Sequence, residues 1–198
     1  LSSLSYLKNE NSHDPYCKID DLISNNEDLV ILTGNYNNFF GKLFYSNKLK
    51  LFEKLIQELK FSFKSRLYIE IQRHQESQEK NYENYLLNIS SLFDLPIIAG
   101  QEVYYLDASM AEAHDALICI GKKQFLDDKN RFRYSNQHYF KNNHEIKKLY
   151  EDIPEALENN YNFPFRCNFR PLSSKPILPN ISSEKGISAD EILKKDSL

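Results

Sequence analysis

The sequence is poor in cysteine, in long apolar runs and in positive charge, and each shortage excludes a class of protein. Its three cysteines, Cys17, Cys119 and Cys167, lie far apart and form no CxxC pair, which excludes a disulfide framework and a cysteine zinc site. No apolar run approaches the roughly 20 residues of a membrane helix, and no basic-then-apolar signal peptide opens the chain. The net charge of −3 is not that of a dedicated nucleic-acid-binding domain. We therefore expect a cytoplasmic protein without membrane contact.

Methionine is also scarce, since Met110 is the only one and the chain starts at Leu1. We therefore expect the sequence to be a piece of a longer protein. Apolar residues make up 41% of the chain and charged residues 27%, as in folded globular proteins. A chain of 198 residues has room for one domain with a core, followed by a tail.

Three short apolar segments alternate with two helical patterns in the first half of the chain. Strands are expected at 29–33, 67–72 and 97–99; the first has the composition of a strand buried on both faces, and the second alternates apolar with polar residues. Between them, apolar residues recur at helical spacing over 47–61 and 82–93. This order predicts an α/β fold with parallel strands joined by crossover helices, either as an open sheet or as part of a barrel.

A further helix is predicted from Ser109, because Glu112 three positions later completes a capping box. Four apolar residues form its predicted buried face: Met110, Ala113, Leu117 and Ile120. Cys119 on the same helix is assigned to the core. His114 lies beside the predicted buried face, and we expect it to bond a neighbouring carboxylate rather than to act in catalysis.

The remaining chain is predicted to be mostly helix and loop, with an extended tail. A helix is expected to begin at Pro154, and Pro164 should end it, because proline cannot continue helical hydrogen bonding. After residue 170, the segment PLSSKPILPNISSEKG combines prolines and serines without apolar periodicity. We therefore expect one domain over 1–170 and an extended linker over 171–198.

The segment GNYNNFFGKL at 34–43 superficially resembles a phosphate-binding loop after a strand. A P-loop has four residues between its glycines and a Ser or Thr after its lysine, whereas this segment has six residues there and then Leu43. We expect a loop between a strand and a helix.

Several strings in the chain carry a resemblance to a known family. The segment 67–120 contains LYIEIQRH, then LPIIAGQEVYYL, then EAHDALICIG. These strings resemble the YxEIQRH-like, TNDxHYL-like and AEAHDxLLCI motifs of the alpha subunit of DNA polymerase III, in the same order. The likeness continues in YFK at 139–141, PEALEN at 154–159, RCNF at 166–169 and KPILP at 175–179. It extends over nearly the whole chain.

The resemblance implies a fold and a setting for the chain. The family's amino-terminal PHP domain is a seven-stranded distorted barrel, which in some members holds metal ions and hydrolyses phosphoesters. The segment 1–170 resembles the later portion of that domain, and 171–198 would then lead to the polymerase core. The resemblance also implies a parent that synthesises DNA with magnesium. Its implied partners are the rest of the alpha subunit, the proofreading exonuclease subunit, other replisome proteins and DNA. No catalytic polymerase residue is expected within the chain itself.

A degenerate metal site is implied by the same motifs. His74 matches the histidine of the EIQRH motif, while Glu102 and Tyr104 occupy the positions of a metal-binding aspartate and histidine. His74 and Glu102 both follow predicted strands, at the edge where parallel sheets place their chemistry. A catalytic zinc needs three protein ligands, and a phenol with a pKa near 10 is a poor one. The hypothesis of hydrogen-bonded polar residues is therefore preferred over that of a zinc or manganese site.

Basic residues outnumber acidic ones between residues 122 and 148, where aromatic residues are interleaved. Four of them are predicted contacts to DNA or a partner protein: Lys122, Lys123, Arg131 and Arg133. Three hypotheses for the chain remain open: a structural and partner-docking part of a polymerase, a metal-dependent phosphoesterase, and a nucleic-acid-binding module.

Overall fold

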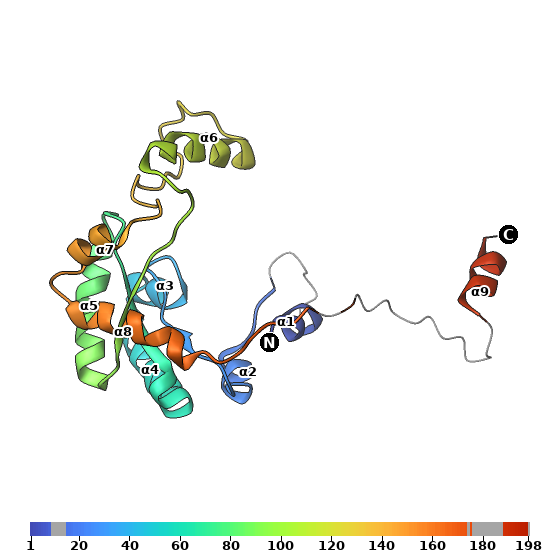
Figure 1. The fold of residues 1–198 in the computed structure, drawn as a ribbon, viewed down its shortest axis with the longest axis horizontal. Helices are drawn as coiled ribbons and strands as arrows, with labels where there is room; N and C mark the ends of the chain where they lie inside the picture. The colour runs from blue at the N-terminus through green and yellow to red at the C-terminus, as the bar shows by residue number, and fades with distance from the viewer. Residues whose placement is uncertain (9–14, 174, 176–187, 198) are drawn as a thin grey trace. The chain divides into compact units, whose positions relative to one another are not determined.

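The computed structural model describes residues 1–8, 15–173, 175 and 188–197, which divide into two compact units (Figure 1). The first unit is Leu1–Arg166 and the second is Cys167–Leu198. The strands are β1 (Ile31–Leu32), β2 (Leu67–Gln72) and β3 (Ile97–Gly100). The α-helices are α1 (Ser2–Lys8), α2 (Ile19–Ser24), α3 (Phe39–Tyr45), α4 (Leu49–Phe63), α5 (Glu79–Phe93), α6 (Ala111–Lys122), α7 (Asn143–Leu149), α8 (Pro154–Asn162) and α9 (Ala189–Asp196). Three short 3-10 helices are η1 (Lys64–Arg66), η2 (Ala108–Met110) and η3 (Phe163–Arg166).

The three described strands form one parallel sheet in the order β1-β2-β3. Ile31 is in register with Leu67, and Ile69 with Ile97. Helices α3 and α4 connect β1 to β2, and α5 connects β2 to β3. The predicted α/β fold with parallel strands and crossover helices is therefore confirmed.

The central strand β2 holds the core together because its side chains are buried on both faces of the sheet. The core around it is built from the apolar faces of α4 and α5 and from the strands: Phe52, Ile56, Leu59, Leu67, Ile69, Ile71, Tyr82, Leu86, Ile89 and Ile97. On the far side, α8 covers the free edge of β3. Asn160 accepts the N–H of Ala99 at 2.9 Å and donates to its carbonyl oxygen at 2.7 Å. The edge of β3 is thereby protected from pairing with another chain.

Two predictions for the region around β1 were wrong. The strand expected over 29–33 is limited to Ile31 and Leu32, and it lies at the sheet edge with Leu32 41% exposed instead of buried on both faces. The loop expected over 34–43 gives way to α3 at Phe39. Helix α3 begins there because its Phe40 is part of the core, where it packs against Phe52 with ring centroids 4.9 Å apart.

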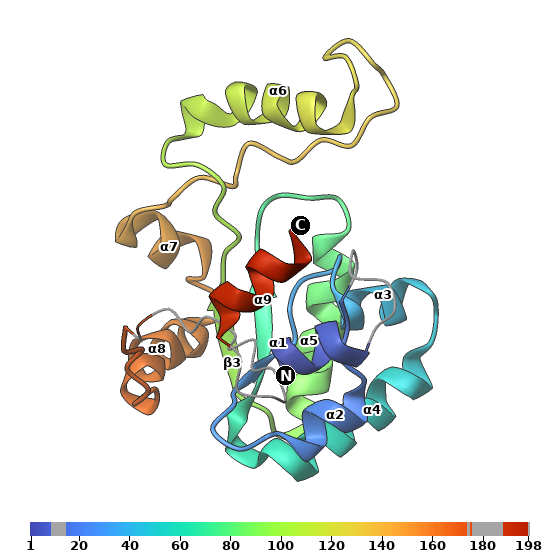
Figure 2. The same cartoon turned by 90° about the vertical axis from the view of Figure 1, so that its right-hand side faces the viewer.

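Residues 101–141 leave the sheet and return to it, and we call this segment the arm. Its outgoing and returning segments meet at an isolated bridge, where Tyr104 donates its N–H to the carbonyl of His138 and Phe140 donates to that of Tyr105, each at 2.9 Å. Helix α6 lies at the outer end of the arm, away from α3, α4 and α5 (Figures 1 and 2).

The predicted start and the predicted buried face of α6 were both wrong. Asp107 caps the preceding turn, since its Oδ1 accepts the N–H of Ser109 at 2.8 Å, and the expected Ser109–Glu112 capping box is not formed. The four side chains assigned to its buried face, Met110, Ala113, Leu117 and Ile120, are exposed, with 75% of Ile120 accessible to solvent. Cys119 is buried, as predicted.

The carboxyl-terminal part of the chain follows the prediction only in part. Helix α8 ends at Asn162 and continues as the 3-10 turn η3, which contains Pro164, as expected of a proline. The predicted linker over 171–198 lies partly outside the described residues, and its described end forms α9 rather than an extended tail. Among the described residues, every helix is too short or too polar to cross a membrane.

Candidate functional site

The polar residues predicted from the family motifs meet at the carboxyl ends of β2 and β3. His74 follows β2 by two residues, and Glu102 follows β3 by two residues. The backbone N–H of Glu102 donates to Nε2 of His74 at 3.2 Å. The ends of neighbouring parallel strands lie side by side, so a contact between these two positions follows from the topology.

His74 is 2% exposed, and both of its ring nitrogens are engaged by protein groups. Nδ1 lies 3.1 Å from Oε1 of Glu79, the first residue of α5. Because Nε2 accepts from a backbone N–H, the proton of the neutral ring is on Nδ1 and is donated to Glu79. The Glu79 carboxylate also accepts the backbone N–H groups of His74 at 2.8 Å and of Glu76 at 3.1 Å. One carboxylate at a helix start thus fixes the whole turn between β2 and α5.

A second histidine, His138, completes the site. Its ring stacks on that of His74, with centroids 4.1 Å apart and an interplanar angle of 2°. Its Nδ1 donates to the carbonyl oxygen of Glu102 at 3.1 Å. Nε2 of His138 is buried and has no hydrogen-bond partner among the described residues, and Oε1 of Glu76 lies 3.9 Å away. Burial, together with the neighbouring His74, lowers the pKa of His138.

The two imidazoles bracket the backbone of a single residue, Glu102. His74 accepts the N–H of Glu102, and His138 donates to its carbonyl oxygen. The returning segment of the arm is also bound, since Ser135 donates its hydroxyl to the carbonyl of His74 and its N–H to Glu76 at 2.7 Å. The arrangement ties the arm to the end of β2.

Tyr104 lies on the solvent side of this bracket. Its hydroxyl donates to Oε2 of Glu102 at 3.1 Å and lies 3.3 Å from the hydroxyl of Tyr134. Burial, followed by the hydrogen bond to Tyr134, raises the pKa of Tyr104, so its phenol is protonated at neutral pH. His114 stacks on Tyr104 with centroids 5.1 Å apart. Its predicted bond to a carboxylate is not among the contacts of the described residues.

These residues do not fit a catalytic metal ion. Both nitrogens of His74 are used within the protein, and the carboxylate of Glu102 accepts from a protonated phenol. Within the described ranges, no three His, Cys, Asp or Glu side chains are grouped so that they could hold a metal. An open metal site needs such a group together with a free position for water.

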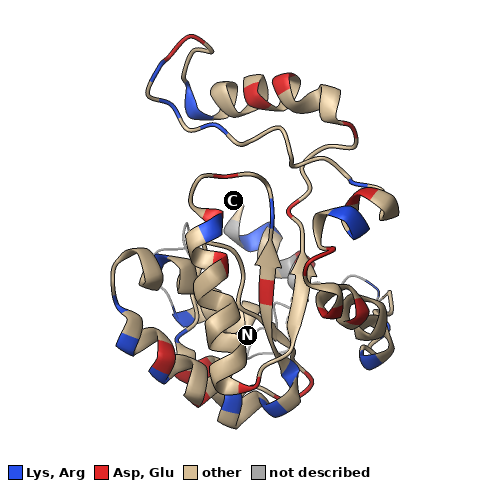
Figure 3. Cartoon of the chain, turned by 90° about the vertical axis from the view of Figure 1, so that its left-hand side faces the viewer, with Lys and Arg blue, Asp and Glu red and all other residues tan. Residues whose placement is uncertain are grey.

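The four basic residues predicted to contact DNA or a partner differ in exposure. Figure 3 colours the lysines and arginines along the chain blue. Arg131 is buried, and its guanidinium pairs with Asp115 while Nε donates to the carbonyl of Leu126. Its guanidinium is therefore not exposed for a contact with DNA or a partner. Lys122, Lys123 and Arg133 are exposed.

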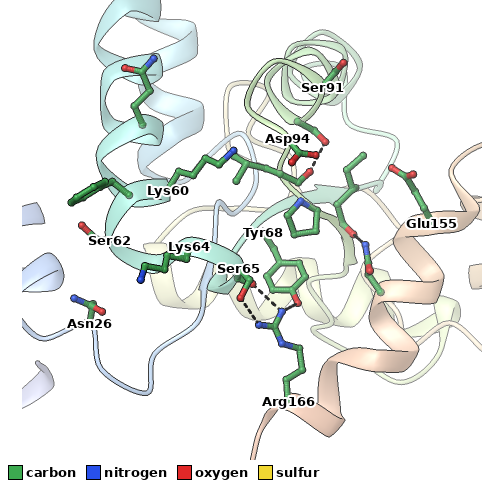
Figure 4. A pocket seen from close by; sticks show the side chains of 17 residues that line it. Asn26, Lys60, Ser62, Lys64, Ser65, Tyr68, Ser91, Asp94, Glu155 and Arg166 are labelled. Atoms are coloured by element: carbon green, nitrogen blue, oxygen red, sulfur yellow. Dashed lines mark hydrogen bonds between the residues drawn. The ribbon is translucent and has the colours of Figure 1, made fainter.

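A separate groove of about 1590 Å³ lies at the amino-terminal ends of β2 and β3 (Figure 4). Two of its three basic side chains are held by protein groups: Arg166 donates to the carbonyl of Ser65 at 2.9 Å and lies over the ring of Tyr68, and Lys60 donates to a backbone carbonyl. Parallel sheets place their chemistry at the opposite ends of the strands. We therefore assign no reaction to this groove.

Sequence reasoning missed His138, although the residue directly precedes the YFK string at 139–141. A histidine beside a family string is a usable signal. Only the return of the arm, however, brings His138 within stacking distance of His74, which is 64 positions earlier in the chain.

Comparison with known proteins agrees with the motifs. No family model matches the chain. Over its full length it is 33% identical to DNA polymerase III subunit alpha of Rickettsia conorii, and the match covers 17% of that protein. It is 31% identical to the same subunit of Caulobacter vibrioides, over 98% of this chain and 17% of the relative. With the subunit of Pseudomonas aeruginosa, 30% identity extends over 86% of this chain and 15% of the relative. The chain thus spans less than a fifth of the length of these curated relatives.

Proposed function

The chain is a homologue of one segment of DNA polymerase III subunit alpha, and we propose that it forms a non-catalytic, structural part of such a subunit. The parent would carry out template-directed DNA synthesis in chromosome replication. The observation that carries this proposal is the match of the whole chain to a single portion of these much longer relatives. Segment 1–170 is assigned to the later portion of the PHP domain, and 171–198 to the link with the polymerase core.

The contacts of His74 favour the structural role over a phosphoesterase. A metal ion at this position would have to displace either the Glu79 carboxylate or the N–H of Glu102, both of which hold the fold. Leaving that half-buried N–H unpaired costs at most about 1–3 kcal/mol. The pair of histidines instead serves to fix the arm on the sheet.

The proposed role assigns partners to the surface of the chain. The rest of the alpha subunit is its covalent partner, and the proofreading exonuclease subunit and other replisome proteins would dock on the outer helices. Magnesium and DNA would be held by the parent's polymerase core. The exposed residues Lys122, Lys123 and Arg133 are available for a partner or for DNA. In this role the chain acts in the cytoplasm.

Metal content is the first test. The purified chain and a His74→Ala variant are incubated with zinc or manganese, dialysed, and measured by elemental analysis. We expect substoichiometric metal in both proteins, because His74 has no free lone pair. One metal ion per chain, lost in the variant, would contradict the structural role and support the phosphoesterase.

Oligonucleotide binding is the second test. A module that holds nucleic acid through basic side chains loses affinity as salt rises, with a slope set by the number of phosphate contacts. We expect no salt-dependent binding of single-stranded DNA by the isolated chain. Tight binding that Lys123→Ala and Arg133→Ala weaken would favour the nucleic-acid-binding module instead.

A further inference from the structure

Helix α6 exposes an apolar face. Met110, Leu117 and Ile120 are each at least 45% accessible, and Ala113 between them is exposed as well. Their intervals of three, four and three residues place them on one side of the helix. At the end of this row, a Cβ added to Gly121 would meet nothing within 4 Å. The face is therefore open along the length of the helix.

The opposite side of α6 is fixed by the arm's own return segment. Asp115 pairs with Arg131, and Cys119 is buried. Nζ of Lys122 lies 4.9 Å from the ring centroid of Phe132. Because these contacts set the rotation of the helix, the exposed face is presented in a defined direction.

The chemistry of the face fits another helix. A 3-4-3 spacing of apolar side chains is that of a helix-packing seam, in which side chains of one helix fill the gaps of the other. The face itself carries no charged side chain, but Lys123 follows at the carboxyl-terminal end of the helix. A complementary helix would carry an acidic side chain where it meets Lys123.

The size of the face selects the source of that helix. From Met110 to Gly121 it is about 16 Å long and about 10 Å wide, which gives a footprint of about 160 Å². Stable association of separate proteins buries about 800 Å² on each partner, so a second copy docked through α6 alone would not be held. A segment of the same polypeptide acts at an effective concentration in the millimolar range and needs much less area.

We propose that the apolar face of α6 docks an amphipathic helix from another part of the same polypeptide, outside this chain. The match of this chain to only 17% of the Rickettsia conorii subunit supports a large remainder that could supply it. The inference rests on the proposed function, because it takes the parent to be a polymerase subunit.

Cysteine labelling tests the docking in the isolated chain and in the full-length parent subunit. Cys17 and Cys167, which are exposed, are replaced by serine, while the buried Cys119 is kept. Ala113→Cys probes the face. Glu112→Cys is the matched control, because it is exposed on the same helix about 100° around the axis. The rate of reaction with a maleimide dye is measured at both positions under native conditions.

In the isolated chain the two positions should react at similar rates. In the parent, Ala113→Cys should react more slowly than Glu112→Cys by on the order of tenfold or more, because labelling then requires local opening. Equal rates in the parent would overturn the proposal. Slow labelling of Ala113→Cys in the isolated chain that speeds up on dilution would also overturn it, in favour of a second copy.

DNA synthesis by the same parent separates the two proposals. Protection of Ala113→Cys in a parent without polymerase activity would contradict the proposed function but support the docking. Synthesis without protection would overturn the docking alone.

Discussion

Replacing His74 by alanine tests whether the histidine bracket holds the arm to the sheet. The substitution leaves the N–H of Glu102 without its acceptor, at about 1–3 kcal/mol, and removes a hydrogen bond to the Glu79 carboxylate worth about 1.5–3 kcal/mol. Loss of the stacking on His138 adds about 0.5–1.5 kcal/mol. Because Glu102 is only half-buried, water can replace part of the lost hydrogen bonding. We therefore expect a net loss of about 3–5 kcal/mol in the free energy of unfolding.

Urea unfolding of the wild type and of His74→Ala measures this loss, with an unchanged m-value as evidence that both proteins unfold in the same way. The exposed His144 provides the control, since His144→Ala should shift the free energy by no more than about 0.5 kcal/mol. Hydrogen exchange should accelerate at the amides of Glu102 and Tyr104 in His74→Ala. A His74→Ala variant as stable as His144→Ala would refute the reasoning. Stabilisation of the wild type by added zinc would also refute it, since a ligand stabilises only the state that binds it.

Three other contacts give further predictions. Arg131→Ala should lower the Tm because it leaves the Asp115 carboxylate without its partner, whereas Arg133→Ala should not; the reverse order in differential scanning fluorimetry would contradict the inward placement of Arg131. Tyr150→Phe should cost about 1–2 kcal/mol in urea unfolding, because its buried hydroxyl lies 3.0 Å from the carbonyl oxygen of Ile71 and 2.9 Å from that of Gly100 and donates its one proton between them; an unchanged midpoint would contradict this. Burial holds the pKa of His138 below its usual 6.5, so below that pH the unfolded state binds more protons than the folded one. Stability should therefore fall from pH 6.5 down to the folded-state pKa, and His138→Gln should reduce this part of the slope; an identical pH profile would count against it.

The contacts of the bracket support the proposal that residues which the family motifs relate to metal binding have a structural role in this chain. Glu79 and the peptide of Glu102 occupy both nitrogens of His74, and the phenol of Tyr104 occupies the carboxylate of Glu102. Each polar group is thus satisfied by a neighbour, apart from Nε2 of His138. In this chain, these residues stabilise the junction between the arm and the sheet.

Local patterns were sufficient for the elements whose partners are close in the sequence. The helical spacing over α4 and α5, the alternation in β2 and the apolar run of β3 predicted those elements, and their order along the chain predicted parallel strands. The same order placed His74 and Glu102 at one edge of the sheet. The family strings identified the relatives, since they depend on residue identity and not on conformation.

Tertiary structure decided what depends on distant contacts. Apolar periodicity in α6 predicted a buried face, but whether a neighbour covers that face cannot be read from the helix itself, and Leu117 and Ile120 are exposed. Arginine side chains are usually exposed, but the return of the arm brings the guanidinium of Arg131 into an ion pair with Asp115. His138 joins His74 for the same reason. The sequence by itself determined the sheet, its crossover helices and the position of the site, because these follow from local periodicity and strand order. Only the tertiary structure decided which polar groups are paired there and which apolar face remains open, because both depend on segments brought together from far apart in the chain.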